Sequence, residues 1–156
     1  MHALSELVVR WTGAGESLAR AGNRDERAAP HGVYPCDGDD AWIAIAVGDE
    51  AEWDALVAAM GDPPWALAPP YTSSAGRLAH VAELDERLAA WTRDFAPYEL
   101  MAGLQEAGVP AGVAQTPEML LRDPQLAHRG HFVRVEHPAL GPLFVERSGF
   151  RLSEHP

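Results

Sequence analysis

The shortness of the apolar segments is the feature of this sequence that most constrains its fold. The longest strongly hydrophobic segment, residues 42–47, has the length of a β-strand and falls far short of the roughly 18–20 apolar residues that a membrane span needs. The 14 Gly and 13 Pro residues of the chain separate such segments from one another. Because 156 residues suffice to bury a sizeable core, we expect a folded domain of short helices and strands.

Three longer segments carry apolar residues at the spacing of one helix face. One helix is predicted to begin after Asp49, a favourable N-cap residue, and to end at Gly61. The other two are predicted at about residues 80–93 and 97–107, the latter with proline at its first position. Since only a few residues join these two helices, we expect them to form an antiparallel helical hairpin.

The first segment of the chain predicts a further amphipathic helix. Its apolar side chains follow the spacing of one helical stripe: Leu4, Leu7, Val8, Trp11 and Leu18. An uncovered stripe of this kind indicates an interaction surface, so we expect Trp11 near a contact with a second copy or with another chain. We predict that residues 1–32 form this helix and a linker-like loop, and that residues 33–156 form a small α+β domain.

The remaining apolar segments predict short strands and short helices. The strand candidates are residues 33–34, 42–47, 109–113, 132–135 and 143–145, and the short helices are residues 117–121 and 123–130. The proline-rich residues 62–76 predict a loop. The expected fold class is therefore α+β, with a helical hairpin packed on short antiparallel strands and an N-terminal helix.

The charges of the chain narrow the range of partners. Twelve arginines against 23 acidic residues give a net charge of −11, and the sequence contains no lysine. The arginines are dispersed among acids, so we expect no binding of nucleic acid. The lack of lysine excludes Schiff-base chemistry and a Walker-type phosphate clamp. With no signal peptide, no membrane span and a single cysteine, Cys36, we expect a cytoplasmic protein that binds no membrane.

No catalytic constellation can be derived from the residues alone. Three histidines within residues 128–137 lack a zinc-site pattern, so we expect exposed or locally bonded imidazoles and no metal. Ser73 and Ser74 belong to no Gly-x-Ser-x-Gly motif, which leaves a small hydrolase as a minor alternative. The acids that follow Cys36 should raise the pKa of its thiol and weaken it as a nucleophile.

Several blocks of residues nevertheless stand in a distinctive order. They are Gly22-Asn23-Arg24, Ala29-Pro30-His31-Gly32-Val33-Tyr34-Pro35-Cys36, Asp37-Gly38, residues 42–47, residues 52–56, Arg77, Glu83-Leu84-Asp85, Trp91-Thr92, residues 104–112 and residues 123–126. In these blocks and their spacing the chain resembles the type III CoA-transferase family, which includes formyl-CoA transferase, carnitine CoA-transferase and alpha-methylacyl-CoA racemase. The resemblance extends over essentially the whole sequence.

The resemblance implies the small domain of a larger enzyme. Family members are longer, and their nucleophilic aspartate lies in an N-terminal half that has no counterpart in this sequence. The resemblance therefore assigns no catalytic residue, no cofactor-binding residue and no bound cofactor to this chain, and it implies activity only together with a complementing N-terminal half. Coenzyme A and acyl-CoA are the implied substrates of the complete enzyme. Since family members form interlocked dimers, the implied partner is that half or a second copy.

The resemblance also implies one substrate-facing segment. Residues 22–32 correspond to a glycine-rich loop that covers the activated aspartate in formyl-CoA transferase. The implied substrate-facing residues are Gly22, Asn23, Arg24, Pro30, His31 and Gly32. Two alternatives stay open: a non-catalytic interaction module or subunit that has lost the chemistry, and a fragment of an acyl-CoA racemase.

Overall fold

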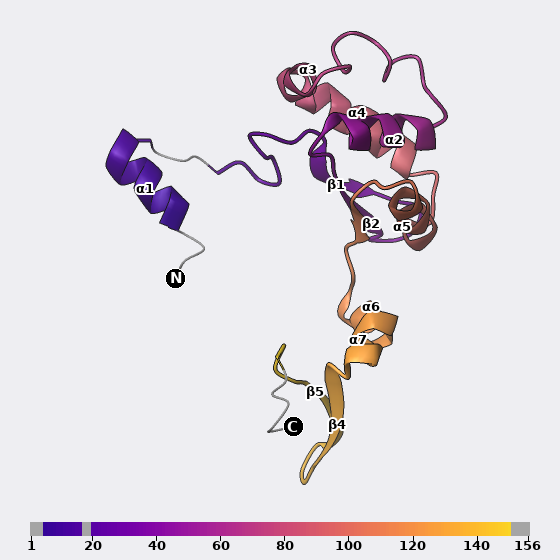
Figure 1. Ribbon diagram of the computed structural model, residues 1–156. Coiled ribbons are helices and arrows are strands. Elements are labelled where there is room, and N and C mark those ends of the chain that lie inside the picture. The colour runs from indigo at the N-terminus through magenta and orange to yellow at the C-terminus, as the bar shows by residue number, and fades with distance from the viewer. Residues whose placement is uncertain (1–4, 17–19, 151–156) are drawn as a thin grey trace. The chain divides into compact units, whose positions relative to one another are not determined.

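The computed structural model describes residues 5–16 and 20–150, and the chain divides into two compact units, residues 1–113 and 114–156 (Figure 1). Two residues of the predicted N-terminal stripe, Leu4 and Leu18, lie outside the described residues. The first unit contains a three-stranded sheet with helices, and the second contains two short helices and a hairpin. The α+β fold class predicted from the sequence is confirmed.

The predicted N-terminal helix is present as α1, Ser5–Ala14. It ends where Gly15 adopts a left-handed backbone conformation, with a φ of 69°. None of its side chains is buried, and Trp11 is 65% exposed. The apolar stripe of α1, here Leu7, Val8 and Trp11, is therefore open to solvent in this structure.

The sheet of the first unit consists of β1 (His31–Pro35), β2 (Trp42–Ala46) and β3 (Ala111–Val113) in the order β1-β2-β3, with both pairs antiparallel. Alternation along the strands sends Tyr34 and its partner Ile43 into the core. Val33 and its partner Ala44 therefore lie on the opposite face.

The inner face of the sheet is covered by helices. The helices of this unit are α2 (Glu50–Ala59), α3 (Ser74–Ala79), α4 (Val81–Thr92) and α5 (Pro97–Glu106). The two predicted hairpin helices both pack on the sheet, α4 against β1 and α5 against β3 and β2, and α2 packs against α5 (Figure 1). The core includes Ile43, Ile45, Leu56, Leu84, Leu88 and Leu104, each 2% exposed or less.

The second unit begins with α6 (Pro117–Arg122) and α7 (Pro124–Arg129), which are followed by the antiparallel strands β4 (Phe132–His137) and β5 (Gly141–Glu146). The side chain of Thr116 caps α6 and that of Asp123 caps α7, each accepting a main-chain N–H three residues later. None of the described helices in either unit is long and apolar enough to cross a membrane.

Two boundaries differ from the sequence prediction. The predicted loop over residues 62–76 ends early, because the Ser73 hydroxyl accepts a hydrogen bond from the N–H of Gly76 and so caps α3. The predicted loop over residues 22–32 also ends early. His31 and Gly32 already belong to β1, where they pair with Ala46 and Ile45.

Candidate substrate-facing loop and its anchor

The structure places the six predicted substrate-facing residues in two environments. Gly22, Asn23 and Arg24 are exposed, whereas Pro30 is fully buried. His31 is exposed and Gly32 is half-buried at the start of β1. The loop thus has a solvent-facing beginning and a buried end.

His31 ties the two ends of this loop together. Its Nδ1–H donates a hydrogen bond to the main-chain carbonyl of Asn23. Because a carbonyl only accepts, this contact fixes the ring tautomer of a neutral His31 and leaves Nε2 as the acceptor nitrogen. The exposed imidazole can therefore accept a hydrogen bond through Nε2.

Two grooves flank the loop and share Asn23, His31, Gly32 and Val33 in their walls. The sheet groove has a volume of about 400 Å³, and its further lining residues are Ala44, Ile45, Ala46, Pro110, Ala111 and Gly112. The helix groove has a volume of about 370 Å³, and its further lining residues are Ala21, Arg24, Tyr34, Asp85, Glu86 and Ala89. Of the predicted residues, Asn23, Arg24, His31 and Gly32 line a groove, whereas Gly22 and the buried Pro30 line neither.

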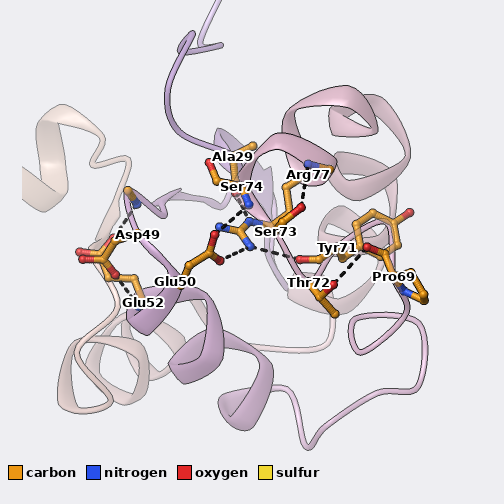
Figure 2. A network of polar contacts seen from close by, with 12 residues as sticks. Ala29, Asp49, Glu50, Glu52, Pro69, Tyr71, Thr72, Ser73, Ser74 and Arg77 are labelled. Carbon is orange, nitrogen blue, oxygen red and sulfur yellow. Dashed lines mark hydrogen bonds and ion pairs between the residues drawn. The ribbon is translucent and has the colours of Figure 1, made fainter.

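A buried arginine holds the end of the loop. Arg77, on α3, is 1% exposed, and its Nε donates to the carbonyl of Ala29 over 2.9 Å. Its Nη1 donates to Glu50 Oε2 over 2.7 Å and to the carbonyl of Tyr71 over 3.1 Å. The guanidinium also lies 4.9 Å from the centre of the Trp53 ring. Figure 2 shows this guanidinium between Ala29, Glu50 and Tyr71.

Glu50 completes the anchor from the first turn of α2. Its second carboxylate oxygen, Oε1, accepts the N–H of Ser74 over 2.9 Å, so one side chain bonds both to Arg77 and to the first residue of α3 (Figure 2). The Arg77 guanidinium, and next the N–H of Ser74, lower the pKa of the Glu50 carboxyl. The charge of the buried arginine is thus balanced by a carboxylate that remains 55% exposed.

A side chain of the same strand leaves no room for any residue larger than glycine at position 32. A Cβ at this position would lie 2.8 Å from the hydroxyl oxygen of Tyr34 and 3.0 Å from its Cζ. The Tyr34 ring cannot easily yield, because it is 3% exposed and its hydroxyl donates to Asp85 Oδ1 over 2.8 Å. Burial, together with the bond to Asp85, raises the pKa of Tyr34 far above its ordinary value.

The other residues considered for chemistry have structural surroundings. Cys36 is 6% exposed, and its burial raises the pKa of the thiol, so the physical cause is desolvation and not the neighbouring acids. His137 Nδ1 accepts the N–H groups of Ala139 and Leu140 in the β4–β5 turn. Over residues 5–16 and 20–150, no group of three or more His, Cys, Asp or Glu side chains is arranged to hold a metal ion.

The comparison with known proteins assigns the family. The sequence model of CoA-transferase family III matches residues 1–156, and the chain therefore belongs to this family. A succinyl-CoA–D-citramalate CoA-transferase of Chloroflexus aurantiacus is 31% identical over 153 residues, which is 98% of this chain and 38% of that protein. A probable CoA-transferase of Mycobacterium tuberculosis is 38% identical over 117 residues, which is 74% of this chain and 15% of that protein.

A solved structure shares the fold. A CAIB/BAIF family protein from Brucella suis superposes with a TM-score of 0.84 at 25% sequence identity, covering 99% of this chain and 39% of that one. The chain therefore spans less than two fifths of the length of these relatives.

Proposed function

We propose that this chain is the later portion of a type III CoA-transferase and takes part in moving CoA between an acyl-CoA and a carboxylic acid. The observation that carries the proposal is the family match over all 156 residues, together with the short share of each relative that the chain spans. In this proposal the nucleophilic carboxylate comes from the portion of the enzyme that has no counterpart here. Coenzyme A is a substrate of the complete enzyme and not a resident cofactor.

The loop is proposed to contribute its exposed residues to the boundary of the substrate site. Asn23, Arg24 and His31 support this role, because they are exposed beside the two grooves. Arg77 supports it as well, because it fixes the main chain at Ala29, immediately before Pro30. Pro30 is buried, and in this proposal it helps to place the loop.

The isolated chain is proposed to be inactive. The cysteine, a nucleophile of the right chemical type, is buried with a raised pKa, so thiolate attack is disfavoured. Sustained CoA transfer by the purified chain between short-chain acyl-CoA donors and free acids, above a buffer control, would contradict this proposal.

A chimera tests the transferase role directly. The chain replaces the aligned 153-residue stretch of the Chloroflexus relative, and CoA transfer from succinyl-CoA to D-citramalate is measured, followed by a panel of other donors and acids. We expect a folded chimera to transfer CoA. Substitution of Leu67, an exposed loop residue that lines neither groove, by Ser serves as a control that should leave the rate unchanged. A folded chimera without activity on any pair would favour the interaction-module alternative.

The exposed stripe of α1 supports association with a second copy or with another chain. Leu7, Val8 and Trp11 are 44%, 57% and 65% exposed, an amount of apolar surface that is favourable to cover. Replacing Leu7 and Trp11 by Ser should shift the sedimentation of an associated chain towards the monomer without unfolding residues 31–113. A wild-type chain that sediments as a monomer at tens of micromolar would contradict self-association.

A further inference from the structure

The central strand of the three-stranded sheet is apolar on both faces. Residues 42–47 form a continuous apolar run, and β2 occupies most of it. An antiparallel strand with one face in water normally alternates apolar and polar residues, whereas a continuous apolar run is typical of a strand covered on both faces. The sequence of β2 is therefore typical of a sheet that is covered on both faces.

Within the described residues of the first unit, only one of these faces is covered. Ile43 and Ile45 on the inner face are 0% and 2% exposed. The open face, which we define by Val33, Trp42, Ala44 and Ala46, is much more accessible, with Val33 39% and Trp42 38% exposed. The sheet groove of about 400 Å³ runs over Val33, Ala44 and Ala46 on this face.

The open face has the composition of an interface. None of its four residues is charged, and the one polar group, the Trp42 indole N–H, already donates to Asp40 over 2.8 Å. The side chains of Ala44 and Ala46 are small, so another backbone can approach this face closely. Trp42 supplies a large aromatic side chain of the kind found in the centres of interfaces. The candidate site residues Asn23 and His31 line the same groove.

The length of the relatives identifies the occupant. More than half of the Chloroflexus transferase and of the Brucella protein lies outside the stretch that this chain matches. We infer that the open face is the docking surface for that remaining portion of a type III CoA-transferase, whether it is joined to this chain or separate. The inference deepens the proposed function and rests on it. Docking there would bring Asn23 and His31 to the boundary between the two portions.

Cysteine labelling tests the inference. In a Cys36→Ala background, single cysteines are introduced as Val33→Cys and Ala44→Cys on the open face and as Leu67→Cys in a loop that is 55% exposed. The rate of reaction with a maleimide is measured for the isolated chain and for the chimera with the Chloroflexus relative. In the isolated chain we expect open-face rates similar to that of Leu67→Cys. In the chimera we expect the open-face rates to fall by about 10-fold or more, with Leu67→Cys unchanged.

Each outcome decides the question. Fast labelling at Val33→Cys and Ala44→Cys in the chimera overturns the inference. Slow labelling in the isolated monomer would mean that another part of this chain covers the open face. Labelling that slows as the protein concentration rises would mean that a second copy covers it. Either result also overturns the inference. If the chimera does not fold, the same three labels in the Chloroflexus transferase itself, at the aligned positions, give the answer.

The labelling result is independent of catalysis. A chimera that is protected at the open face but transfers no CoA supports the docking surface and contradicts the proposed function. A chimera that transfers CoA but stays unprotected at the open face supports the proposed function and contradicts the docking surface. Val33→Asp gives a second measurement: it should leave the thermal midpoint of the isolated chain unchanged, because the side chain faces water, and it should lower the yield of folded chimera. Leu67→Asp is its matched control.

Discussion

The Nε–H of Arg77 donates a hydrogen bond to the main-chain carbonyl of Ala29, a residue 48 positions earlier in the sequence, over 2.9 Å. This contact joins α3 to the end of the candidate loop. It belongs to a buried arginine whose other bonds reach α2 and the segment before α3, so a single side chain sets the relative position of three pieces of the main chain.

Arg77→Met should lower the free energy of unfolding by about 2–4 kcal/mol, because two buried carbonyls and a carboxylate lose their shared donor. Urea denaturation measures the change. Arg87→Met is the matched control, since Arg87 also pairs with a glutamate, Glu83, and also lies over a tryptophan ring, Trp65, but is 40% exposed. We expect the control to change stability by about 1 kcal/mol or less. Equal losses in the two variants would contradict the anchoring role.

Arg77→Lys should loosen the loop even where the domain stays folded. A lysine has one nitrogen and cannot reproduce the separate bonds of Nε to Ala29 and of Nη1 to Glu50. We expect faster amide hydrogen exchange across residues 22–30 in this variant, with little change in β2. Unchanged exchange in the loop would show that Arg77 only stabilises the core.

Gly32→Ala should destabilise the first unit by about 1–3 kcal/mol, because the added Cβ meets the fixed ring of Tyr34. Gly112→Ala, on the opposite edge strand of the same sheet, has open space around its Cβ and should be neutral or slightly stabilising. Tyr34→Phe, which removes the nearest clashing atom, should recover part of the loss in a double-mutant cycle. Additive effects of the two changes would contradict the proposed clash.

Two helical glycines should respond in opposite directions to alanine. Gly103→Ala in α5 has open space and should stabilise the protein by about 0.5–1 kcal/mol through helix propensity. Gly76→Ala in α3 places its Cβ against the carbonyl oxygen of Pro70 and should destabilise by more than about 1 kcal/mol. Thermal unfolding of the two variants measures both changes. A stabilised Gly76→Ala variant would be the contrary result.

Acid should weaken the Glu50–Arg77 pair. The folded state lowers the pKa of Glu50 below its ordinary value of 4.5, so the contribution of the ionised carboxylate to stability is present above that value and is lost as the pH falls through the folded-state pKa. The stability difference between the wild type and Glu50→Gln should therefore be largest near pH 7 and shrink below about pH 4. Urea unfolding across this range measures it. A stability difference that does not change with pH would mean that the charge of the Glu50 carboxylate does not contribute to stability.

Local signals predicted most of the elements. Asp49 predicted the start of α2, and its carboxylate does accept the N–H of Glu52 over 2.9 Å. Pro97 predicted the start of α5. The sequence does not reveal Ser73 as the cap of α3, because the prolines and serines around it have the composition of a loop.

The anchor of the candidate site could not be derived from such signals. The sequence points to Arg77 only through the family resemblance, and its partners Ala29 and Tyr71 contribute main-chain carbonyls that every residue possesses. Because Arg77 and Ala29 are 48 residues apart in the sequence, local patterns could not predict their contact. The sequence places His31 in the loop, because its strand pairing with Ala46, which extends β1 into the predicted loop, cannot be derived from local patterns.

Beyond Trp42, which begins the strand on the open face, the two faces of β2 differ in side-chain volume and not in polarity. Ile43 and Ile45 fill the inner face, while Ala44 and Ala46 occupy the other. Slipping β2 by one residue would exchange isoleucine for alanine at two core positions, a change that costs about 2–5 kcal/mol at each buried site. The register of the sheet is thus selected by size, which allows a strand to be apolar all round and still have one correct orientation.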